Sequence, residues 1–211
     1  MYSSRLISML GVSLIFTVGV FFQNPVTTSA FAAPENFILA DAMVKRTDSG
    51  LNADMLSEKE IVQDGTKGAM GVAVITDKGF DSVIVSTSHK GVHDSSKQQN
   101  ANDPVWHNHF VKLEVDSSGN TNKCGKDPVV KDLTFHSPGN VIISGNRVQL
   151  SEVPSQFSSY SSLNNNTLGF EIGSKIDKVV TFKLNPVMGS NGNVEAVCVT
   201  DVKPTGNLSV E

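Results

Sequence analysis

All five histidines of this 211-residue chain fall within one stretch, from His89 to His136. His89 and His93 are four residues apart, His107 and His109 are two apart, and His136 stands alone. A neutral imidazole offers a ring nitrogen lone pair at neutral pH, and it is the commonest protein ligand for transition metals. The cluster therefore predicts that the protein binds or senses a transition metal ion, and zinc, copper, iron and manganese are not distinguished.

The pair His107 and His109 is the best defined part of this predicted site. Residues two apart on a strand point to the same face, so both rings could approach one ion at about 2.0–2.1 Å. His136 ends another strand-like run and is expected to supply a third imidazole from a neighbouring strand end. His89 or His93 would then add a fourth ligand, or carry a proton, from the adjoining polar loop.

Carboxylates close to the histidines in the sequence offer a second type of chemistry. Asp94, Asp103 and Glu114 are the candidates. In a zinc-dependent enzyme, Glu114 or Asp94 would act as the base on a metal-bound water. A metalloenzyme is therefore an alternative to a protein that only binds metal.

One family pattern supports that alternative. His107-Asn108-His109 followed by Glu114 has the His-x-His-(x)4-Glu spacing of the first cupin motif. His136 followed by Asn140 has the His-(x)3-Asn spacing that ends the second motif. The sequence thus resembles a cupin metal site over about 34 residues. The resemblance implies a metal held inside a β-barrel by His107, His109, Glu114 and His136.

A third hypothesis involves neither metal nor catalysis. Exported proteins also carry unliganded histidines on strand edges and in loops. The chain would then be an extracellular interaction module whose polar loops bind a partner that the sequence does not identify.

The first 32 residues have the order of a secretory signal peptide. Arg5 is the only charged residue before Glu35, Leu6 to Phe22 is nearly all apolar, and Ala30-Phe31-Ala32 forms an A-x-A cleavage site. We predict cleavage after Ala32 and a secreted, extracellular or periplasm-like location. An uncleaved membrane anchor is the alternative, since the apolar run is only slightly short of the about 20 residues that a spanning helix needs.

The charge balance bears on the class of partner. The chain has 17 Lys and Arg against 21 Asp and Glu, a net charge of −4. Removal of residues 1–32 leaves 16 against 21, a net charge of −5. A mildly acidic chain without basic clusters is not typical of nucleic-acid binding, nor of binding to an anionic membrane surface after signal cleavage.

The two cysteines, Cys124 and Cys198, predict one disulfide, because an even count in an exported chain favours pairing. Two free thiols, one of them a soft metal ligand, are the alternative reading.

The remaining sequence predicts a mainly β protein, an antiparallel β-sandwich or barrel with a short helical N-terminal segment. Residues 33–66 are expected to form a helical or irregular arm, because Phe37, Ile38, Leu39, Met43 and Val44 give a rough helical stripe. Residues 67–211 read as short β-branched runs separated by Gly, Pro, Asn and Ser clusters. Residues 90–103 and 155–166 are expected to form long loops, and the first lies between two histidine groups, which favours a function there.

Overall fold

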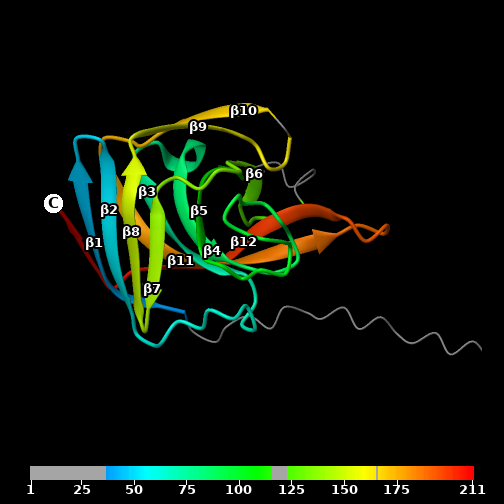
Figure 1. Ribbon diagram of the computed structural model, residues 1–211, viewed down its shortest axis with the longest axis horizontal. Helices are drawn as coiled ribbons and strands as arrows, with labels where there is room; N and C mark the ends of the chain where they lie inside the picture. The colour runs from blue at the N-terminus through cyan, green and yellow to red at the C-terminus, as the bar shows by residue number, and fades with distance from the viewer. Residues whose placement is uncertain (1–36, 116–122, 165) are drawn as a thin grey trace, which may run out of the picture.

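The computed structural model describes residues 37–115, 123–164 and 166–211. The predicted signal peptide, residues 1–32, lies outside the described residues. Described residues form two main β layers (Figure 1). One is a five-stranded sheet in the order β13-β1-β2-β8-β7. Its strands are β1 (Leu39–Thr47), β2 (Gly50–Ser57), β7 (Asn140–Ser144), β8 (Arg147–Pro154) and β13 (Asn207–Val210).

The other layer is a closed six-stranded barrel in the order β11-β12-β6-β5-β4-β3. Every neighbouring pair in it is antiparallel. Its strands are β3 (Met70–Thr76), β4 (Val83–Ser88), β5 (His107–Glu114), β6 (Val129–Leu133), β11 (Ile176–Met188) and β12 (Val194–Pro204). A separate hairpin is made by β9 (Gln156–Tyr160) and β10 (Thr167–Glu171), and a 3-10 turn, η1 (Gly79–Asp81), precedes β4.

Two hydrophobic clusters form the core of the described part of the fold. The first combines buried side chains of the five-stranded sheet, such as Val44, Met55 and Val148, with Val72 and Phe110 of the barrel. Burial of such side chains contributes about 1.5–3 kcal/mol each. The first cluster therefore joins the sheet to the barrel.

The second cluster receives at least one buried side chain from every strand of the barrel, so it fills the barrel interior. Alternate residues of a strand point to opposite faces, and the barrel strands accordingly divide their apolar side chains between the two clusters. The members of the second cluster are Ala73, Ile75, Val83, Val85, Val111, Leu133, Val180, Phe182 and Val199.

The prediction of a mainly β protein is confirmed, but the helical N-terminal segment was wrong. Residues 39–57 form β1 and β2, two antiparallel strands of the five-stranded sheet. Ala42 and Val44 are buried, while Met43 and Lys45 between them are exposed, which is the two-residue period of a strand. The short apolar run had suggested a helical stripe, but pairing with β8 and β13 selects the extended conformation. Among the described residues, no helix is long and apolar enough to cross a membrane.

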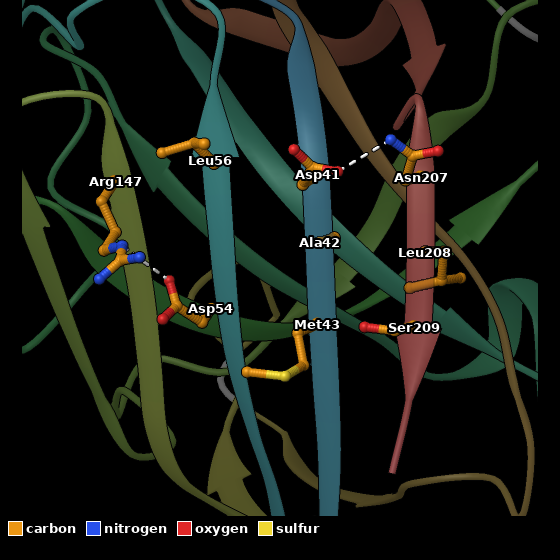
Figure 2. A pocket seen from close by; sticks show the side chains of 9 residues that line it. All are labelled: Asp41, Ala42, Met43, Asp54, Leu56, Arg147, Asn207, Leu208 and Ser209. Atoms are coloured by element: carbon orange, nitrogen blue, oxygen red, sulfur yellow. Dashed lines mark hydrogen bonds and ion pairs between the residues drawn. The ribbon is translucent and has the colours of Figure 1, made fainter.

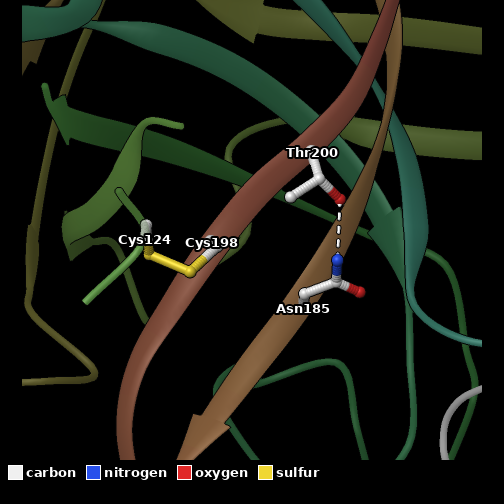
Figure 3. The surroundings of a disulfide bond; sticks show 4 residues. All are labelled: Cys124, Asn185, Cys198 and Thr200. Atoms are coloured by element: carbon white, nitrogen blue, oxygen red, sulfur yellow. Dashed lines mark hydrogen bonds between the residues drawn. A yellow bond between two sulfur atoms is a disulfide. The ribbon is translucent and has the colours of Figure 1, made fainter. Parts of the chain in front are cut away.

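The predicted disulfide is confirmed. Cys124 is bonded to Cys198 of β12, with a Cα–Cα distance of 5.4 Å (Figure 3). It links the segment before β6 to the strand that β6 meets at Val129 and Cys198. Neither cysteine is free, which is compatible with an oxidising compartment.

Candidate metal site

Four side chains that can bind metal meet at one end of the barrel. They are His89, Asp94, His107 and His109, and one donor atom from each lies within 4.8 Å of the donor atoms of the others. His89 directly follows β4, and Asp94 lies in the segment between β4 and β5. The two remaining histidines are the first and third residues of β5.

The alternation along β5 places both of its histidines on the inner face of the barrel. His107 and His109 share a face with Val111, which belongs to the second cluster, whereas Phe110 points the other way into the first cluster. In the register with β4, His109 lies opposite Val85. His107 and His109 are buried, and the strand that carries them is packed on both of its faces.

Asp94 lies at the centre of the group. Its Oδ2 is 3.2 Å from Nε2 of His89, and its Oδ1 is 3.3 Å from Nε2 of His107 and 3.7 Å from Nε2 of His109. Four donor atoms around one zinc ion at about 2.0–2.1 Å are roughly 3.4 Å apart. The distances to Asp94 are close to this spacing.

Hydrogen bonds set the orientation of the two buried imidazoles. Nδ1 of His107 is 2.8 Å from the carbonyl oxygen of Val105, and Nδ1 of His109 is 2.7 Å from the carbonyl oxygen of Thr134. A carbonyl oxygen only accepts, so each Nδ1 must carry the proton and donate it. In the neutral ring, each Nε2 then keeps a lone pair directed toward Asp94. Metal-binding histidines are typically held by this kind of bond from the second ring nitrogen.

Three buried polar atoms of this group have no hydrogen-bond partner. They are Nε2 of His107, Nε2 of His109 and Oδ1 of Asp94. When the rings are neutral, all three atoms are hydrogen-bond acceptors. Their lone pairs then face one another at close range, with no proton between them. Buried polar atoms are rarely left unpaired. Such an arrangement needs a cation or an added proton among the acceptors.

The electrostatics oppose the added proton on His107. Burial lowers the pKa of His107 to about 4, although the neighbouring carboxylate of Asp94 acts in the opposite direction. Burial by itself would raise the pKa of Asp94, but the close imidazoles of His107, His109 and His89 outweigh it and hold that pKa well below its usual range. At neutral pH the site therefore contains a carboxylate beside a neutral His107, which is the protonation state that a metal ion requires.

The segment that carries Asp94 is organised by a buried glutamine. Oε1 of Gln98 accepts hydrogen bonds from the backbone N–H groups of Asp94 and Ser95, at 3.0 and 3.2 Å. Its Nε2 donates to the carbonyl oxygens of Val92 and Asp103, at 3.1 and 3.2 Å. No local pattern predicts this role, since Gln98 stands among other polar residues.

His93 and His136 lie outside the group. His93 is exposed, and its Nε2 is 3.1 Å from the carbonyl oxygen of Gln98. His136 is also exposed, with its Nδ1 3.1 Å from Oγ of Ser159. After β6 the chain first passes His109, whose ring donates to the carbonyl of Thr134. It then turns to meet β9. His136 is therefore directed away from the two histidines with which the sequence had grouped it.

The other two candidate carboxylates have local partners of their own. Glu114 ends β5 and forms an ion pair with Lys131, at 2.9 Å. Asp103 accepts hydrogen bonds from the backbone N–H groups of Gln99 and Val105, at 2.9 and 3.1 Å. The cupin pattern requires Glu114 and His136 on the same ion as His107 and His109, and the structure does not bring these four together.

A separate hollow lies on the exposed face of the five-stranded sheet (Figure 2). Its charged side chains have partners within it: Asn207 donates to Asp41 at 2.8 Å, and Arg147 forms an ion pair with Asp54 at 3.1 Å. The buried acceptors found at the end of the barrel have no counterpart among these paired groups.

The chain matches no protein-family model, no curated protein and no solved structure.

Proposed function

We propose that this protein binds a divalent transition metal ion through His89, Asp94, His107 and His109. The observation that carries the proposal is the set of buried, unpartnered acceptors on Asp94, His107 and His109. A metal ion would accept all of these lone pairs at once.

Zinc is the ion that this donor set suits best. Three imidazoles and one carboxylate are borderline ligands that can surround an ion tetrahedrally, as zinc prefers. Copper, iron and manganese share histidine ligands with zinc and are the competitors to test. Both cysteines are in the disulfide, so no thiolate is present to favour copper(I).

The proposed place of action is outside the reducing cytosol. The Cys124–Cys198 disulfide is compatible with an exported protein, and the sequence of residues 1–32 predicts an export signal. We propose that the metal is bound after export.

A metal-binding role is favoured over catalysis by a metal-bound water. Asp94 lies among the histidines as a ligand candidate, and Glu114 is paired with Lys131. Neither candidate base is therefore placed to serve a water molecule on an ion in this site.

The test uses protein freed of metal with a chelator and purified without a histidine tag. Zinc, copper(II), manganese(II) and iron(II) are titrated by calorimetry, and bound metal is counted by mass spectrometry. We expect one ion per chain in the wild type and none in His107→Ala/His109→Ala. The matched control His93→Ala/His136→Ala, which also removes two histidines, should bind as the wild type does. Loss of binding in the control but not in the first variant would refute the assignment.

A further inference from the structure

We infer that the ion has a structural role: it fastens residues 90–105, the segment between His89 and Trp106, to the end of the barrel. This inference rests on the proposed function and specifies the role of that site. Four protein donors complete a tetrahedral zinc site and leave no open position, which is typical of structural rather than catalytic zinc.

The four donor residues differ in how firmly the strands of the barrel hold them in place. His107 and His109 stand on β5, which is paired with both β4 and β6. His89 follows β4 immediately, so it is also anchored to the barrel. Asp94 alone comes from the irregular segment that joins β4 to β5. An ion in the site would therefore connect this segment, through Asp94, to the rigid strands.

The segment lacks apolar anchors of its own. Its valines, Val92 and Val105, are 37% and 38% exposed, whereas its buried side chains, Ser95 and Gln98, are polar. The buried Trp106 of the first cluster comes directly after the segment. Hydrophobic burial, the main stabilising force elsewhere in the fold, therefore contributes little here. Regions with few buried apolar contacts are those that open most readily.

Single hydrogen bonds, together with an edge-to-face contact between the rings of His93 and Phe135, hold the segment to its surroundings. Ser88 donates its hydroxyl to the carbonyl of Pro104 at 2.7 Å, and Ser162 donates to the carbonyl of Asp94 at 2.6 Å. The backbone N–H of Ser96 donates to the carbonyl of Phe135 at 3.0 Å. Three such bonds restrain the segment without burying it, so a bond from Asp94 to an ion would be its strongest attachment.

The order of burial within the site shows which side faces solvent. The side chain of His107 is completely buried and that of His109 nearly so, whereas the side chain of Asp94 is 15% exposed. An ion reaching the two imidazoles must pass the edge that Asp94 occupies. Loading and release of the ion are thus coupled to movement of residues 90–105.

The experiment is hydrogen–deuterium exchange of the full chain, metal-free and with zinc at about 100 times its dissociation constant, with binding measured separately by calorimetry. If opening requires release of the ion, amide exchange over residues 90–105 slows by up to about 100-fold. Exchange in β3 and β11, which already lie in the core, should not change.

Asp94→Asn is the discriminating variant, because it nearly preserves the shape of the side chain. Three imidazoles should still take up zinc, more weakly, but the slowing over residues 90–105 should be lost at saturation. One zinc bound in the wild type with unchanged exchange of this segment would overturn the structural role and leave the proposed function standing. Failure of zinc, copper(II), manganese(II) and iron(II) alike to bind would overturn the proposed function, and this inference with it.

Discussion

Gln98→Leu is the most informative single substitution outside the ligands. It keeps the approximate volume of the side chain but removes four hydrogen bonds, to the backbone groups of Asp94, Ser95, Val92 and Asp103. Each is worth about 0.5–1.5 kcal/mol net, so closing the segment becomes less favourable by about 2–6 kcal/mol. The global free energy of unfolding should change less, because the segment lies outside both hydrophobic clusters and can open on its own.

The consequence for metal binding follows from the position of Asp94. Its backbone N–H is one of the two donors that Gln98 holds, so the carboxylate loses its fixed place among the imidazoles. Loss of a residue that supports a ligand typically weakens metal affinity about 10- to 100-fold, or about 1.4–2.7 kcal/mol. The assay is calorimetric titration of metal-free protein with zinc, beside thermal unfolding of the same samples.

Gln99→Leu is the matched control. Gln99 is exposed, and its side chain forms no hydrogen bond within the described ranges of the chain. It should bind zinc as the wild type does. A folded Gln98→Leu variant with wild-type zinc affinity would refute the reasoning, because Asp94 would then be positioned without the buried glutamine.

Three further predictions concern stability. In the metal-free protein, the free energy of unfolding should fall as the pH drops from about 6.5 to 4. Burial lowers the pKa of His107 to about 4 in the folded protein, so the unfolded chain takes up the proton at a higher pH than the folded chain does. Urea unfolding should show a loss of about 3 kcal/mol at pH 4 that is missing in His107→Gln. Replacement of Cys124 and Cys198 by serine should cost about 4 kcal/mol in the same assay, because their bond closes a loop with a sequence separation of 74 residues; an unchanged midpoint would contradict this. Phe110→Ala should cost about 3–5 kcal/mol, since that ring is fully buried, whereas Phe80→Ala, at a 41% exposed ring, should change stability by less than about 0.5 kcal/mol.

Part of the candidate site could be predicted from local sequence rules. The two-residue period of a strand is enough to put His107 and His109 on one face, and the structure places them so. The pairing of Cys124 with Cys198 followed from their count alone. These features depend on short-range geometry or on the absence of alternatives.

The inclusion of Asp94 in the group and the exclusion of His136 depend on contacts that local rules do not reveal. Asp94 reaches the imidazoles because Gln98 folds its segment through four hydrogen bonds. His136 is kept away because the chain after β6 turns to pair with β9, where Ser159 meets it. The Gln98 bonds span three to six residues of an irregular segment, and the Ser159 contact joins residues 23 apart, so neither follows from the period of a regular element.

The N-terminal strands illustrate the same limit for the fold. The apolar residues before Val44 fit a helical stripe as readily as a strand when the segment is considered alone. Pairing of β2 with β8, about a hundred residues later, decides the outcome. Sheet pairing between distant segments is invisible to a short window of sequence.

The most direct test of the central claim is X-ray absorption spectroscopy at the zinc edge of the loaded, tag-free protein. The account predicts about four nitrogen or oxygen donors at about 2.0–2.1 Å, with scattering from three imidazoles and no sulfur. In His89→Ala the imidazole count should fall to two, whereas His136→Ala should leave it at three. Zinc surrounded mainly by oxygen, or an imidazole count that falls in His136→Ala and not in His89→Ala, would contradict the proposed site.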